Sequence, residues 1–262
     1  MSDSLRVWVG PVSRAQVQAR AQDVVYPCTG DGAHGSHTCR AWAAAHPLAE
    51  LVAGVDGPFQ LCAFSAGAQA VKQWAPTITE ALQARIEGLY LFDGLYETQR
   101  EHADPGLVAW CVRAAQRETV FFASVSSSPN KTYGSGSEVA GWLRAAVARE
   151  LDQSWTEFES LELEGLKPAR AAYVMGNAVI IDWDAIYQHG DHPVLVAPTV
   201  LESDLIPLFG PPAQGHGDPQ GPGDRARWPF MVGVAGACVG VIGAIAIAAT
   251  LHTRQRRREE QR

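Results

Sequence analysis

The chain has 262 residues, which is enough for one large domain or two small ones. Its composition, 47% hydrophobic and 19% charged, excludes a wholly disordered chain, a coiled coil and a collagen-like repeat. The net charge of −7 argues against nucleic acid as the main partner, because phosphate binding requires a basic surface.

The first 209 residues alternate short apolar runs with helical patterns. Strands are expected over 5–9, 24–26, 59–64, 89–92, 120–125 and 179–183. Helices are expected over 13–22, 65–74, 77–87, 107–117, 137–151 and 200–209, with another helical stretch that ends near Gly54 and is broken at Pro47. Residues 152–178 show no clear pattern. Strands that alternate with helices predict an α/β domain over 1–209, with a mainly parallel sheet covered by helices on both faces.

The composition changes sharply after this domain. Residues 210–227 are rich in Gly and Pro and are expected to form a linker. Residues 228–253 contain no Lys, Arg, Asp or Glu. The 22 residues of 230–251, in which Thr250 is the one strongly polar side chain, would form a helix of about 33 Å, enough to cross a bilayer. We therefore expect one C-terminal transmembrane helix over 228–253, followed by a basic tail at 254–262.

Small residues recur every fourth position within this expected span, a pattern that permits close helix pairing. They predict a homodimer contact through Gly236, Gly240, Ala244 and Ala248.

Three features bear on the side of the membrane on which the domain lies. Residues 1–10 lack the basic and apolar regions of a signal peptide, which favours a tail-anchored, single-pass protein with a cytoplasmic domain. The arginines after the span oppose this orientation, because positive residues favour the cytoplasmic side. Five cysteines accord with the cytoplasmic placement: Cys238 lies in the span, and the other four show neither a disulfide framework nor metal-binding spacing.

A serine stands where an apolar strand runs directly into a helical pattern. Residues 63–67 read Ala-Phe-Ser-Ala-Gly, with small residues two positions before and after Ser65. A sharp strand-to-helix turn needs such small neighbours, and it would expose the hydroxyl above the sheet. The backbone N–H of Ala66, at the start of the helix, would then lie where it can stabilise an oxyanion.

This pentapeptide resembles the nucleophile elbow of the α/β-hydrolase superfamily, whose usual pattern is G-x-S-x-G; Ala63 departs from it at the first small position. The resemblance implies a serine hydrolase, esterase- or lipase-like, with no cofactor or metal. In the superfamily an acid and a histidine follow the serine, each after a later strand. Asp93 is the acid that this order favours, with Asp182 and Asp184 as rivals.

The resemblance also places the histidine in the loop between the last strand and the last helix. Both His189 and His192 lie there, and His192 is preferred because it is closer to the helix. The implied reaction is acyl transfer on an ester, thioester or amide, with Ala66 and the loop beginning at Gly10 as oxyanion donors. A small-molecule or lipid-like acyl substrate and the lipid bilayer are the expected partners.

Two other classes compete with this interpretation. A membrane-tethered binding module could use the same scaffold without catalysis, because fold alone does not fix function. The glycine-rich run 30–35 matches G-x-G-x-x-G and has Asp56 about 20 residues on, as in dinucleotide sites, but Pro47 interrupts the following helix.

Overall fold

A computed structural model describes residues 4–28, 36–97, 102–127 and 134–202. All of them belong to the first of two units into which the chain divides, Met1–Ala213. The expected linker (210–227), membrane span (228–253) and tail (254–262) lie outside the described residues, as do the small residues of the expected dimer contact. In the described part of the chain, no helix combines the length and hydrophobicity that a bilayer crossing requires.

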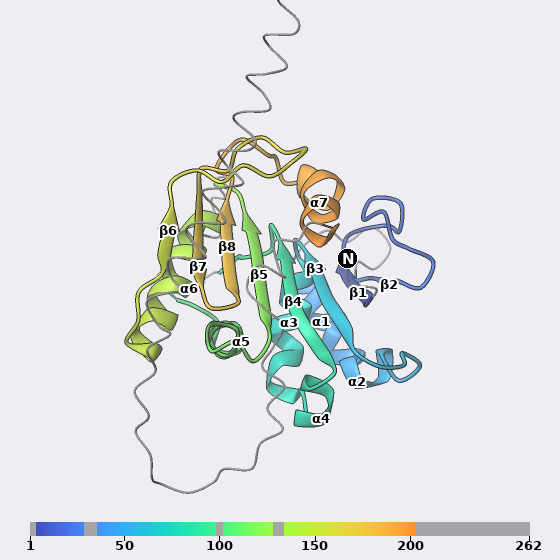
Figure 1. Ribbon diagram of the computed structural model, residues 1–262. Helices are drawn as coiled ribbons and strands as arrows, with labels where there is room; N and C mark the ends of the chain where they lie inside the picture. Colours follow the sequence, from blue (N-terminus) through green and yellow to red (C-terminus); the bar gives the residue numbers. More distant parts are fainter. Residues whose placement is uncertain (1–3, 29–35, 98–101, 128–133, 203–262) are drawn as a thin grey trace, which may run out of the picture. The chain divides into compact units, whose positions relative to one another are not determined.

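Eight strands form one mostly parallel sheet in the order β2-β1-β3-β4-β5-β8-β7-β6, which can be followed in Figure 1. The parallel part comprises β1 (Leu5–Gly10), β2 (Val24–Pro27), β3 (Phe59–Phe64), β4 (Ile86–Phe92), β5 (Val120–Val125) and β8 (Ala178–Asp182). The antiparallel strands β7 (Ala171–Met175) and β6 (Thr156–Phe158) complete one edge. The expected α/β class and mainly parallel sheet are confirmed.

The central strands are buried along their whole length, since both faces of the sheet are covered. One face packs against α1 (Ser36–Ala45), α3 (Gly67–Trp74), α5 (Pro105–Ala115) and α6 (Gly136–Leu151). The other face packs against α7 (Ala197–Glu202), the preceding π-helix η2 (His192–Val196) and extended segments. Three short helices join these elements: α2 (Leu48–Leu51), η1 (Ala75–Thr77) and α4 (Glu80–Gln83).

Several elements differ from the sequence-based expectation. Residues 13–22 form turns instead of a helix, because Gln18 takes a left-handed conformation (φ 47°) and ends the first turn. The helix expected over 77–87 is reduced to η1 and α4, and β4 takes up residues from 86 onward. The last helix begins at Ala197, and 203–209 lie outside the described residues. The unassigned segment 152–178 holds the antiparallel edge strands.

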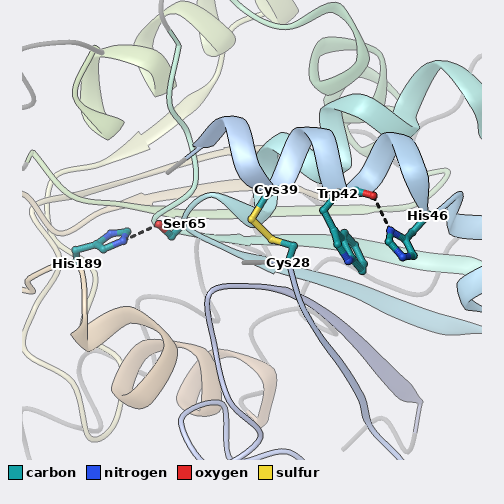
Figure 2. The surroundings of a disulfide bond; sticks show 6 residues. All are labelled: Cys28, Cys39, Trp42, His46, Ser65 and His189. Atoms are coloured by element: carbon teal, nitrogen blue, oxygen red, sulfur yellow. Dashed lines mark hydrogen bonds between the residues drawn. A yellow bond between two sulfur atoms is a disulfide. The ribbon is translucent and has the colours of Figure 1, made fainter. Parts of the chain in front are cut away.

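A disulfide joins Cys28, just after β2, to Cys39 in α1 (Figure 2). The expectation that the cysteines form no disulfide was wrong. The sequence contained no repeated cysteine spacing to indicate the pair; it forms because the carboxyl end of β2 and the start of α1 meet at the same edge of the sheet. The other two cysteines of this unit, Cys62 and Cys111, are buried and free.

Candidate active site

Ser65 lies at the turn between β3 and α3, with a backbone conformation that a non-glycine residue seldom adopts (φ 53°). The turn is held by the Ser65 N–H, which donates to the Phe92 carbonyl at 3.1 Å, and by the Ser65 carbonyl, which accepts from Ala68. A left-handed serine costs about 1–3 kcal/mol, and such strain is concentrated at functional sites. The strand-to-helix turn expected at this serine is therefore present.

Three glycines allow the backbone to pack closely around this turn. A Cβ on Gly67 would lie 2.1 Å from the Val9 carbonyl oxygen, and one on Gly10 (φ 148°) would lie 2.5 Å from the Phe64 carbonyl oxygen. Gly94 lies against the Ser65 backbone, where a Cβ would be 3.2 Å from its oxygen. Any larger residue at Gly67 or Gly10 would push α3 or β1 away from the serine.

Ser65, His189 and Asp93 form a hydrogen-bonded chain at the carboxyl edge of the sheet. His189 Nε2 lies 2.7 Å from Ser65 Oγ, a contact drawn in Figure 2, and His189 Nδ1 lies 2.6 Å from Asp93 Oδ2. Asp93 follows β4 with φ 43°, so it leaves its strand in the same left-handed way as Ser65. Parallel neighbours end at one edge, which is why residues 28 positions apart in the chain meet here.

Asp93 is buried and held in its ionised form by its neighbours. Ser126, just after β5, donates its backbone N–H to Asp93 Oδ1 at 3.0 Å and its hydroxyl at 2.9 Å. Burial acts to raise the pKa of Asp93, but the hydrogen bond with His189, the positive charge that His192 and His189 carry when protonated, and the bond from Ser126 outweigh it. The pKa of Asp93 therefore lies below its ordinary value, and the group is an acceptor for the imidazole at neutral pH.

His189 is held by two aromatic rings, although its side chain is 42% exposed. The Phe64 ring stacks on it at a centroid distance of 4.7 Å, and the Tyr96 ring meets it edge-on at 6.2 Å. The imidazole is thus fixed by a hydrogen bond at each nitrogen and by ring contacts on its sides.

His192, which the sequence favoured over His189, lies elsewhere. It begins η2, is fully buried, and its Nδ1 lies 2.9 Å from the hydroxyl of Ser124 on β5. Burial lowers its pKa, opposed by the negative charge of Asp93, so the ring is held neutral. The choice of His192 was wrong as to position: the turn at 188–191 directs His189 toward Ser65 and turns His192 into the core.

The rival acids are engaged in other pairs. Asp182 accepts from Arg170 at 2.6 Å and from the Ser137 hydroxyl at 3.0 Å. Asp184 binds the hydroxyl of Ser127. Neither has a contact with His189 among the described residues, whereas Asp93 does.

The expected oxyanion residues also lie at the turn. Ala66 is the residue directly before α3, where the first backbone N–H groups of a helix have no partner within the helix. Gly10 ends β1 and lies against Phe64. Of the loop that follows, Pro11 has no N–H and the Ser13 N–H donates to Gln16 Oε1 at 2.9 Å, which leaves Val12 as the donor between them.

Sequence reasoning missed three contributors: Phe64, Tyr96 and Ser126. The position of Ser126 could have indicated its role, because it stands in a run of serines directly after a strand. Hydroxyl groups there lie at the same edge of the sheet as Ser65. Nothing in the sequence indicated the roles of the two rings. No cluster of three or more His, Cys, Asp or Glu side chains suited to a metal occurs in the part of the chain that the structure describes.

Comparisons with known proteins add no assignment: no protein-family model matches the chain, and neither does any curated protein.

Proposed function

We propose that the chain is a membrane-anchored serine hydrolase of the α/β-hydrolase type, which cleaves ester-type bonds through Ser65, His189 and Asp93. The observation that carries the proposal is the continuous hydrogen-bonded chain, 2.7 Å from Ser65 Oγ to His189 Nε2 and 2.6 Å from His189 Nδ1 to Asp93 Oδ2. A strained serine, an imidazole and a buried carboxylate in this order have the geometry of an activated nucleophile.

The reaction follows from these contacts. His189 Nε2 removes the Ser65 proton as Oγ attacks the acyl carbon, and the carbonyl electrons move onto oxygen. Asp93 keeps the proton on His189 Nδ1 and stabilises the imidazolium that forms. The imidazolium then protonates the leaving group as the bond to it breaks, giving an acyl-serine. Water, deprotonated by the same imidazole, releases the acid and restores Ser65.

The tetrahedral oxyanion needs donors that are already in place. The Ala66 N–H at the start of α3 supplies one, and the segment from the end of β1 onward, through Gly10 or Val12, supplies the other. Removing one such donor typically costs about 10²–10³ in rate.

An apolar acyl group is the substrate class that the surroundings of His189 favour. Among the described residues, the large hydrophobic side chains that are exposed are Ile186, Val194 and Leu195. All three lie within six positions of His189 in the chain. Exposed apolar side chains in the segment that carries the histidine would contact an acyl chain more favourably than charged ones would.

The disulfide changes the expected side of the membrane. Cys28–Cys39 is a buried bond of a kind that persists in oxidising compartments and is rare in the cytosol. The arginines of 254–258 favour the cytoplasmic side for the tail. Both observations support a domain that faces away from the cytoplasm, in place of the cytoplasmic placement expected from the sequence. Protease treatment of intact cells should then cleave the domain, and complete protection would contradict this orientation.

Hydrolysis of p-nitrophenyl esters tests the activity. Wild-type protein should cleave butyrate and longer acyl esters faster than acetate, and Ser65→Ala should reduce the rate by at least about 10⁴-fold. Ser154→Ala, which changes an exposed serine after α6, serves as the matched control and should leave the rate unchanged. Equal rates for the Ser65→Ala variant and wild type would reject the proposal and favour a non-catalytic binding module.

A further inference from the structure

Tyr96 brings a hydroxyl to the bond between the imidazole and the carboxylate. Its oxygen lies 3.1 Å from His189 Nδ1 and 3.4 Å from Asp93 Oδ2, so the three groups form a triangle around the Nδ1 proton. Tyr96 lies only three residues after Asp93, in the segment that leaves β4. The reaction described above uses neither its ring nor its hydroxyl.

The backbone of Tyr96 is anchored to the helix that begins at the nucleophile. Its carbonyl accepts hydrogen bonds from Gln69 Nε2 at 3.2 Å and from Lys72 Nζ at 2.7 Å, both on α3. Lys72 also forms an ion pair with Glu97 Oε1 at 2.6 Å, and its side chain is only 2% exposed. A lysine buried in this way is costly unless it is fully paired, so the contact fixes the 96–97 backbone relative to α3. Ser65 and Tyr96 are therefore tied to the same helix.

The phenol is kept protonated where it stands. Burial raises the pKa of Tyr96, and the charge of Asp93 and the hydrogen bond to it raise the pKa further. The hydroxyl can therefore donate to Asp93 Oδ2 while its oxygen faces the Nδ1–H of His189. The ring edge, in turn, covers one side of an imidazole that is otherwise partly open to solvent.

We propose that Tyr96 is a positioning residue that holds the His189 imidazole in line with Ser65 and keeps water from the Asp93–His189 hydrogen bond. This inference rests on the proposed hydrolase function, because it concerns how the same histidine is oriented. The phenol acts through His189 and Asp93 and does not touch the reacting atoms. Water in place of the hydroxyl would compete for Asp93 and let the imidazole rotate.

The test is Tyr96→Phe, which removes the hydroxyl and keeps the ring. We expect kcat for a p-nitrophenyl ester to fall about tenfold with KM within twofold, since hydrogen bonds to charged groups have roughly this effect on rate. The matched control is Tyr26→Phe, which removes a hydroxyl donating to the Leu51 carbonyl at 2.6 Å. It should leave kcat unchanged, whatever its effect on the thermal midpoint.

A double variant separates positioning from general stability. If Tyr96 acts through the carboxylate, adding Tyr96→Phe to Asp93→Asn should slow fluorophosphonate labelling of Ser65 less than twofold further. A full tenfold additional loss would overturn the inference, as would an unchanged kcat in the single variant or a change confined to KM. In each of these three outcomes the wild-type protein remains active, so only the inference about Tyr96 fails. A wild-type protein that neither hydrolyses esters nor reacts at Ser65 would overturn the proposed function itself.

Discussion

Replacing Gly67 by alanine tests whether the turn that carries Ser65 depends on the close approach of α3 to β1. The new Cβ would lie 2.1 Å from the Val9 carbonyl oxygen, 2.7 Å from its carbonyl carbon and 2.9 Å from Gly10 Cα. All three atoms are backbone, so no side chain can rotate away. Reaching ordinary contact, at 3.4 Å or more, requires the helix and the strand to separate by about 1.3 Å.

Both stability and activity should report this displacement. Inserting a methyl group into packed backbone costs about 3 kcal/mol, at the upper end for overpacking, which would lower the thermal midpoint by roughly 6–12 °C. A misplacement of about 1 Å can cost on the order of 100-fold in rate, so Ser65 labelling should slow by a similar factor.

The matched control is Gly141→Ala in the interior of α6, where an added Cβ meets no atom within 4 Å. Helix propensity alone should then stabilise the protein by up to about 1 kcal/mol, with activity unchanged. Urea unfolding followed by tryptophan fluorescence, together with labelling rates, measures both effects. Equal midpoints and labelling rates for Gly67→Ala and wild type would refute the packing argument.

Two further predictions concern groups beside the site. Because burial lowers the pKa of His192, the unfolded chain binds a proton below about pH 6.5 that the folded chain does not. The free energy of unfolding of the wild type should therefore decrease as the pH is lowered, by up to about 1.4 kcal/mol per pH unit. His192→Asn, which keeps an acceptor for Ser124 but cannot titrate, should remove this part of the slope between pH 7 and pH 5 in urea unfolding; an identical slope would contradict it. Replacing Cys28 and Cys39 together by serine opens a loop with a sequence separation of 11 residues and should lower the free energy of unfolding by roughly 3 kcal/mol, and dithiothreitol should reproduce the loss in wild type alone.

The parts of the site that the sequence predicted share one physical origin. Ser65 and Asp93 each follow a buried strand directly, and strands of a parallel sheet end at one edge, so strand order was enough to bring them together. Local pattern was also sufficient for β1, β3 and β5, whose apolar runs are short and clearly bounded.

The choice between His189 and His192 depended on information of another kind. The two histidines are three residues apart in one loop, and their orientation is set by the turn at 188–191 and by the π-helix that begins at His192. Neither feature has a sequence pattern. The disulfide likewise depends on a tertiary contact between the end of β2 and α1, and the edge strands β6 and β7 occur in a segment without apolar periodicity. None of these three features follows from a local sequence pattern.

The most direct measurement is the reaction of the full chain with a fluorophosphonate probe, read out by peptide mass spectrometry. We predict a single adduct on Ser65, at least about 10³-fold slower labelling in His189→Asn, and labelling within tenfold of wild type in His192→Asn. Labelling that is lost in His192→Asn but retained in His189→Asn, or an adduct at any residue other than Ser65, would contradict it.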